Sequence, residues 1–118
     1  MTHRLRTAVA TLSALAAMAL AAPARAAEPR IIEITARRFE FAPKLITLKQ
    51  GEKVVLRVKS EDVTHGFFQR TLGLDADLEP GKAVDLPLTP TAPGRYTVIC
   101  DHFCGAGHGN MNMTIVVE

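Results

Sequence analysis

Apolar and polar residues alternate along the chain from Arg30 onward. Ile32 and Ile34 alternate with charged or hydroxyl-bearing neighbours, and so do Val54, Leu56 and Val58. A period of two predicts β-strands, because successive side chains of a strand point to opposite faces of a sheet. Further runs with strand character occupy residues 44–49, 83–88, 95–100 and 113–117.

Turn-forming residues separate these runs. Gln50-Gly51, Glu79-Pro80-Gly81 and Ala92-Pro93-Gly94 each lie between two of them. About six or seven short strands joined by such turns predict an all-β fold, a β-sandwich. Residues 27–118 contain no convincing amphipathic helix, repeat or linker, so we expect one domain there.

The first residues have the pattern of a secretory signal. Basic side chains precede an uncharged apolar run at residues 8–22, and the run ends in Pro23 followed by Ala24-Arg25-Ala26. This order predicts a signal peptide over residues 1–26, cleaved after Ala26. A membrane anchor is the alternative, but the run is shorter than the roughly 20 residues that a span needs. We therefore expect an exported mature chain, residues 27–118, that does not span the membrane.

The charge balance changes once that segment is removed. The whole chain has 14 lysines and arginines against 12 acidic residues. Arg4, Arg6 and Arg25 lie in the predicted signal, which leaves 11 basic residues in the mature chain. No lysine or arginine block remains, so the composition does not predict a nucleic-acid partner.

Soft metal ligands are concentrated in twelve residues near the C-terminus. Residues 100–111 contain Cys100, His102, Cys104, His108 and Met111. Thiolate and thioether sulfur favour Cu(I), and imidazole accommodates both oxidation states of copper. The segment lies between two predicted strands, so these side chains are expected on one loop of a rigid sandwich.

One further histidine of the mature chain, His65, lies 35 residues before Cys100. Taken singly, the two cysteines would form a disulfide in an oxidising compartment, His65 would be a turn residue and Met111 a core residue. Taken together, the concentration of every mature-chain cysteine and histidine in two segments favours a metal site. A redox dithiol is less favoured, because residues 105–109 are poor helix formers.

The spacing Cys-x3-Cys-x3-His-x2-Met, preceded by His65-Gly66-Phe67, resembles the dinuclear copper A domain of cytochrome c oxidase subunit II and of nitrous oxide reductase. Phe41-Ala42-Pro43 and residues 48–54 and 91–96 are similar to the framework segments of that family. The resemblance covers residues 30–118. It implies a cupredoxin-like Greek-key β-sandwich and a copper-binding domain at residues 27–118.

The resemblance also implies a ligand set for two copper ions. Cys100 and Cys104 would be bridging thiolates, and His65 and His108 would each bind one copper. Met111 would be a weak ligand, and His102 would contribute its main-chain carbonyl, as a glutamate does in the oxidases. A mononuclear type 1 site is the alternative; it needs one thiolate, two imidazoles and a thioether, and leaves Cys100 without a role.

The implied function is electron transfer in the bacterial periplasm by a protein that is not itself an enzyme. Its partners would be redox proteins, such as a cytochrome c or a copper-dependent reductase or oxidase. Copper binding, buffering or delivery, with a copper chaperone as partner, is the alternative. The membrane helices and catalytic domain that accompany the module in its relatives are not expected here. We further expect the glycines around His108, Gly107 among them, to leave room for a partner.

Overall fold

The computed structural model describes residue 14, residues 16–19 and residues 28–118. The signal peptide predicted at residues 1–26 lies mostly outside the described residues, so its cleavage stays a prediction. Within the described part of the chain, no helix is long and apolar enough to cross a membrane.

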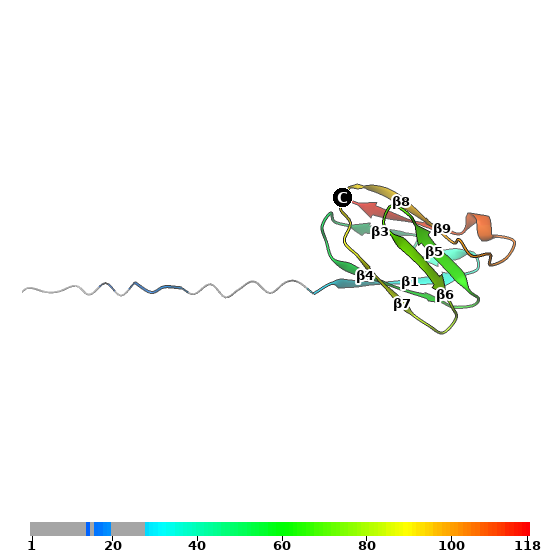
Figure 1. The fold of residues 1–118 in the computed structure, drawn as a ribbon, viewed down its shortest axis with the longest axis horizontal. Coiled ribbons are helices and arrows are strands. Elements are labelled where there is room, and N and C mark those ends of the chain that lie inside the picture. The colour runs from blue at the N-terminus through cyan, green and yellow to red at the C-terminus, as the bar shows by residue number, and fades with distance from the viewer. Residues whose placement is uncertain (1–13, 15, 20–27) are drawn as a thin grey trace, which may run out of the picture.

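In the described residues, nine strands form two packed sheets (Figure 1). One sheet has the order β2-β1-β4-β7 and the other β3-β9-β8-β5-β6. The strands are β1 (Arg30–Arg37), β2 (Glu40–Ala42), β3 (Leu45–Leu48), β4 (Val54–Ser60), β5 (His65–Gln69), β6 (Leu74–Leu78), β7 (Val84–Leu88), β8 (Gly94–Ile99) and β9 (Asn112–Val117). The predicted all-β sandwich is confirmed.

The alternation seen in the sequence produces the core between the sheets. Ile34 on β1 pairs in parallel register with Val58 on β4, and both side chains are fully buried. Val98 on β8 is fully buried in the other sheet. Phe41 and Phe67 meet across the two sheets in an edge-to-face contact, with ring centroids 5.5 Å apart.

The prediction of six or seven strands is lower than the nine strands found in the described residues. It misses β2, which is three residues long, and the hairpin formed by β5 and β6. Gly66 in β5 and the two aspartates in β6 are poor strand formers. These strands form because they pair with each other and pack on the core, which outweighs their weak local preference.

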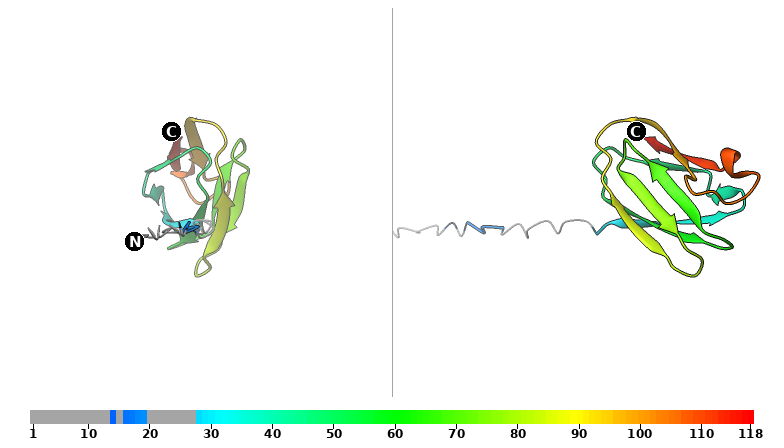
Figure 2. Two further views of the ribbon diagram at one scale, coloured as in Figure 1. Left: turned by 90° about the vertical axis from the view of Figure 1, so that its left-hand side faces the viewer. Right: turned by 45° about the vertical axis from the view of Figure 1, so that its right-hand side comes forward.

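The candidate metal loop, residues 100–111, projects from one end of the sandwich, where β8 ends and β9 begins (Figure 1). The turn between β1 and β2 lies at the same end, as the second panel of Figure 2 also shows. Apart from a single 3-10 turn at His108–Asn110, the described part of the loop has no helix.

The inter-sheet contact gives a test of the core. Phe41→Ala should lower the free energy of unfolding by about 3–5 kcal/mol, because it removes a fully buried ring and leaves a cavity. Ile31→Ala on the same sheet is the control, since Ile31 is half exposed. Urea unfolding of the metal-free protein measures both. Equal losses for the two variants would contradict the packing described.

Candidate metal centre

Two cysteine thiols form the middle of the cluster. Cys100 and Cys104 are both buried and free, with their Sγ atoms 3.8 Å apart. A disulfide would place the two sulfurs about 2 Å apart, so the structure holds a pair of adjacent thiols. Ligand atoms of Cys100, Cys104 and His65 all lie within 4.8 Å of one another.

His65 reaches the pair from another strand. It is the first residue of β5, is fully buried, and places Nδ1 3.9 Å from the Cys100 Sγ. Its Nε2 lies 2.7 Å from Oδ1 of Asp62. An ionised carboxylate can only accept a hydrogen bond, so Nε2 carries a proton, and in the neutral imidazole it is the unprotonated Nδ1 that faces the sulfur.

His108 and Met111 lie on the Cys104 side of the pair. The Cys104 Sγ is 3.6 Å from the His108 Nδ1 and 3.8 Å from the Met111 Sδ. Met111 is buried, whereas His108 is only partly buried. The loop is closed by a hydrogen bond from the Cys100 amide to the Met111 carbonyl, 3.2 Å long.

His102 presents its backbone, and not its imidazole, to the cluster. The Cys100 thiol donates to the His102 carbonyl oxygen at 3.2 Å. The imidazole is exposed, with Nδ1 3.1 Å from the carbonyl oxygen of Phe103. All six residues singled out in the sequence therefore converge, and His102 does so through its main chain.

Asp62 is part of the site, although the sequence analysis did not single it out. Burial by itself raises the pKa of Asp62, but hydrogen bonds from the Arg38 and Val63 amides and from His65 lower it to about 2. The carboxylate is thus ionised at neutral pH and orients His65, as a hydrogen-bonded partner behind a metal-binding histidine does. An aspartate three residues before His65 is a sequence signal that could have indicated this hydrogen-bonded partner.

The Cys104 thiol is difficult to ionise without metal. Burial, reinforced by its hydrogen bond with Cys100 and by the charge of Cys100, raises the pKa of Cys104 to about 11. Since the thiolate is the form that binds metal, a metal ion must displace this proton. The neighbouring Arg38 guanidinium acts in the opposite direction and favours the thiolate.

The glycines of the loop differ in what faces them. A Cβ at Gly107 would come within 2.5 Å of the Phe39 ring, whereas a Cβ at Gly109 would meet nothing within 4 Å. The expectation that Gly107 leaves room for a partner is therefore wrong, because the space beside it is filled by Phe39. Gly109, next to His108, is the open position.

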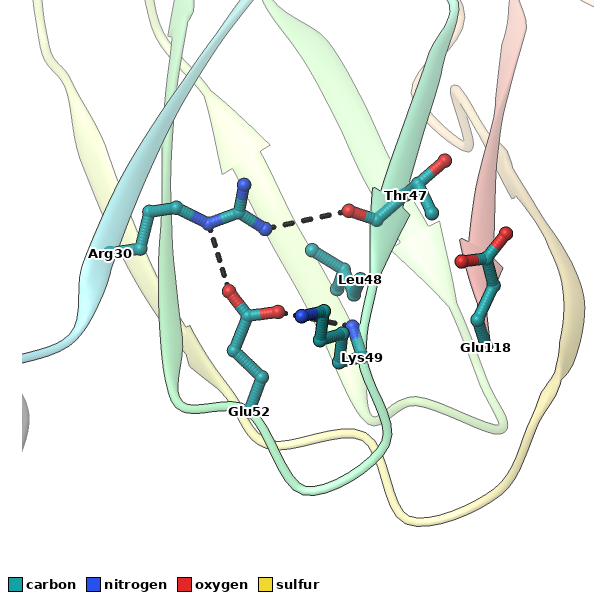
Figure 3. Close-up of a pocket in the computed structure, with 6 residues that line it drawn as sticks. All are labelled: Arg30, Thr47, Leu48, Lys49, Glu52 and Glu118. Atoms are coloured by element: carbon teal, nitrogen blue, oxygen red, sulfur yellow. Dashed lines mark hydrogen bonds and ion pairs between the residues drawn. The ribbon is translucent and has the colours of Figure 1, made fainter.

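A hollow lies at the end of the sandwich away from the candidate metal loop, where β1 begins and β3 and β9 end. Figure 3 shows its lining side chains. The hollow has a volume of about 380 Å³, and an ion pair 2.9 Å long joins Arg30 and Glu52 across it. Its lining residues are Arg30, Thr47, Leu48, Lys49, Glu52 and Glu118. They offer no thiol or imidazole, so this hollow does not have the donors of a copper site.

Comparison with known proteins identifies relatives of the whole sandwich. The cupredoxin-like domain family matches residues 9–117. Cytochrome c oxidase subunit 2 of Thermus thermophilus is 36% identical over 87 residues, which are 74% of this chain and 64% of the relative. Nitrous-oxide reductase of Cupriavidus necator is 30% identical over 91 residues, 74% of this chain and 14% of the relative. The chain thus spans less than two thirds of these relatives.

Solved structures share the fold. A heme-copper terminal oxidase dimer matches with a TM-score of 0.69 and 29% identity, over 75% of this chain and 65% of the matched chain. Auracyanin A, a "blue" copper protein of Chloroflexus aurantiacus, matches with a TM-score of 0.63 and 17% identity, over 77% of this chain and all of auracyanin A. At that identity the second likeness concerns the fold alone. The predicted cupredoxin-like sandwich is confirmed.

The close packing at Gly66 gives a test of the site's framework. A Cβ at Gly66 would lie 2.8 Å from the backbone nitrogens of Asp101 and His102. Gly66→Ala should therefore cost about 1–3 kcal/mol of stability, because backbone must shift to make room. Gly109→Ala is the control, since it faces open space. Thermal unfolding of the two metal-free variants compares them, and a fully stable Gly66→Ala protein would contradict the close approach.

Proposed function

This chain belongs to the cupredoxin-like family, and from that membership and the geometry of the cluster we propose that it is an exported electron carrier that binds two copper ions. It resembles the copper domain of oxidase subunit II. One observation carries the proposal: two buried thiols lie 3.8 Å apart, and each has its own imidazole beside it.

The donor atoms divide into two sets that share the pair of sulfurs. His65 and the His102 carbonyl lie beside Cys100, and His108 and Met111 lie beside Cys104. A mononuclear site built from Cys104, His65, His108 and Met111 would leave Cys100 and the His102 carbonyl unused. Thiolate, imidazole and thioether are the donors that copper electron-transfer sites use. Copper bound here would supply one-electron redox chemistry.

The protein's own contribution is to hold the donors in place and to exclude water. Both thiols, His65 and Met111 are almost fully buried, and the loop that carries most of them is joined to β8 and β9. A preformed site needs little rearrangement when its charge changes, which favours electron transfer. Burial also favours electron transfer over copper delivery, since a metal that is passed between proteins must be reached by the acceptor.

His108 is the most accessible of the side-chain donors. Its imidazole is partly buried, whereas that of His65 is fully buried. The Phe103 ring, 75% exposed, lies beside it with a centroid separation of 5.8 Å. We infer that electrons pass through the edge of His108 to and from a periplasmic redox protein, such as a cytochrome c or a copper-dependent reductase or oxidase. Export rests on the signal pattern at residues 1–26.

Copper stoichiometry and electron paramagnetic resonance test the dinuclear site. The reconstituted protein should bind two coppers per chain, and an electron shared by both nuclei should give more hyperfine lines than one localised electron. Cys100→Ser should lose the shared pattern, because it removes one bridge. One copper in the unaltered protein would contradict the proposal. Loss of copper to a chelator within seconds would instead favour copper handling.

Substitutions at the loop glycines test the electron route. Gly109→Leu should slow electron exchange with cytochrome c by about tenfold or more, because it obstructs docking beside His108. The copper spectrum should stay unchanged, since the position faces open space. Gly107→Leu is the contrast: it collides with Phe39 and should disturb the spectrum itself. Stopped-flow measurements give the rates, and an unchanged rate for Gly109→Leu would exclude this route.

A further inference from the structure

The turn between β1 and β2 touches the metal centre, although its two residues, Arg38 and Phe39, offer no metal ligand. The turn lies at the end of the sandwich from which the loop projects (Figure 2). The Arg38 Nε donates a hydrogen bond to the Cys104 carbonyl oxygen at 2.7 Å. This contact joins residues 66 positions apart in the sequence.

The backbone of Arg38 reaches the other half of the cluster. Its amide donates to Oδ2 of Asp62 at 2.7 Å, and Oδ1 of the same carboxylate accepts the hydrogen bond from His65. One residue is therefore linked to Cys104 through its side chain and to His65 through its main chain. The loop and the strand that supply the donors are connected at this point.

The Phe39 ring packs against the backbone of the loop at Gly105 and Gly107. A Cβ at Gly105 would come within 3.0 Å of the Phe39 ring, and one at Gly107 within 2.5 Å. Gly105 also has a φ of +136°, in the region that favours glycine. The loop backbone thus lies directly on the ring, and the turn holds the loop by packing as well as by hydrogen bonding.

We propose that Arg38 is a positioning residue that clamps the metal loop to the sandwich and raises the reduction potential of the bound copper. The clamp follows from the contacts alone; the effect on the potential rests on the proposed function. A guanidinium is always charged, and its hydrogen bonds to oxygen are stronger than neutral ones. A fixed positive charge beside Cys104 disfavours the oxidised centre, which carries more positive charge.

Three variants separate the clamp from general stability. Arg38→Met removes the charge and the donor, and Arg38→Lys keeps the charge without the planar group that now meets the carbonyl. Arg37→Met is the matched control, because Arg37 is the adjacent arginine and pairs with Glu40. Should Arg38→Met fail to fold, Arg38→Gln takes its place as the neutral variant.

The clamp is tested first on the metal-free protein. Amide hydrogen exchange over residues 104–108 should become about tenfold faster in Arg38→Met, the effect of losing one charge-assisted hydrogen bond. Arg38→Lys should give a smaller increase, and Arg37→Met none. Exchange in β4 and β9 should stay unchanged in all three. Equal exchange in Arg38→Met and Arg37→Met would overturn the clamp.

The charge is tested on the copper-loaded protein. The reduction potential should fall in Arg38→Met and stay near that of the unaltered protein in Arg38→Lys and Arg37→Met. Because the charge lies near the surface, high salt should reduce the shift, which a purely structural effect would not show. An unchanged potential in Arg38→Met would refute the electrostatic role. Failure of the unaltered protein to bind copper would refute the proposed function. The hydrogen-exchange experiment on the metal-free protein would still test whether Arg38 holds the loop.

Discussion

The antiparallel pairing of β8 with β9 fixes where the candidate metal loop leaves the sandwich and where it returns. Ile99 pairs with Asn112, and the next hydrogen bond runs from the Cys100 amide to the Met111 carbonyl. The two ends of the loop are therefore held side by side by backbone hydrogen bonds. Both thiols, the His108 imidazole and the Met111 thioether are brought together within this closure, and the arrangement depends on the register of two core strands.

Bringing His65 to the loop requires a second constraint, because a fully buried imidazole needs a partner for its polar atoms. An unpaired buried donor costs about 1–3 kcal/mol, and Asp62 accepts the hydrogen bond from Nε2. The carboxylate is in turn held by the amides of Arg38 and Val63. The cluster thus rests on a hydrogen-bonded network that links three separate segments, and its geometry belongs to the whole sandwich.

The side-chain donors differ in how far they are buried, and this difference bears on function. Both thiols, His65 and Met111 are enclosed, and His108 alone among the side-chain donors singled out within the cluster is partly accessible. Phe39 fills the space under the loop at Gly107, whereas Gly109 faces open space. The accessible side of the cluster is therefore the 3-10 turn at His108–Asn110. This arrangement is consistent with copper electron transfer.

The sequence by itself determined the β-sandwich and the set of candidate donors, because both follow from the spacing of neighbouring residues. Alternation with a period of two follows from strand geometry, and the donors of residues 100–111 lie within one loop whose ends are strands. Only the tertiary structure decided the roles of Arg38, Phe39 and Asp62 and the existence of β5 and β6. These features depend on contacts between distant segments, and the propensity or spacing of neighbouring residues does not encode which distant segment will pack against them.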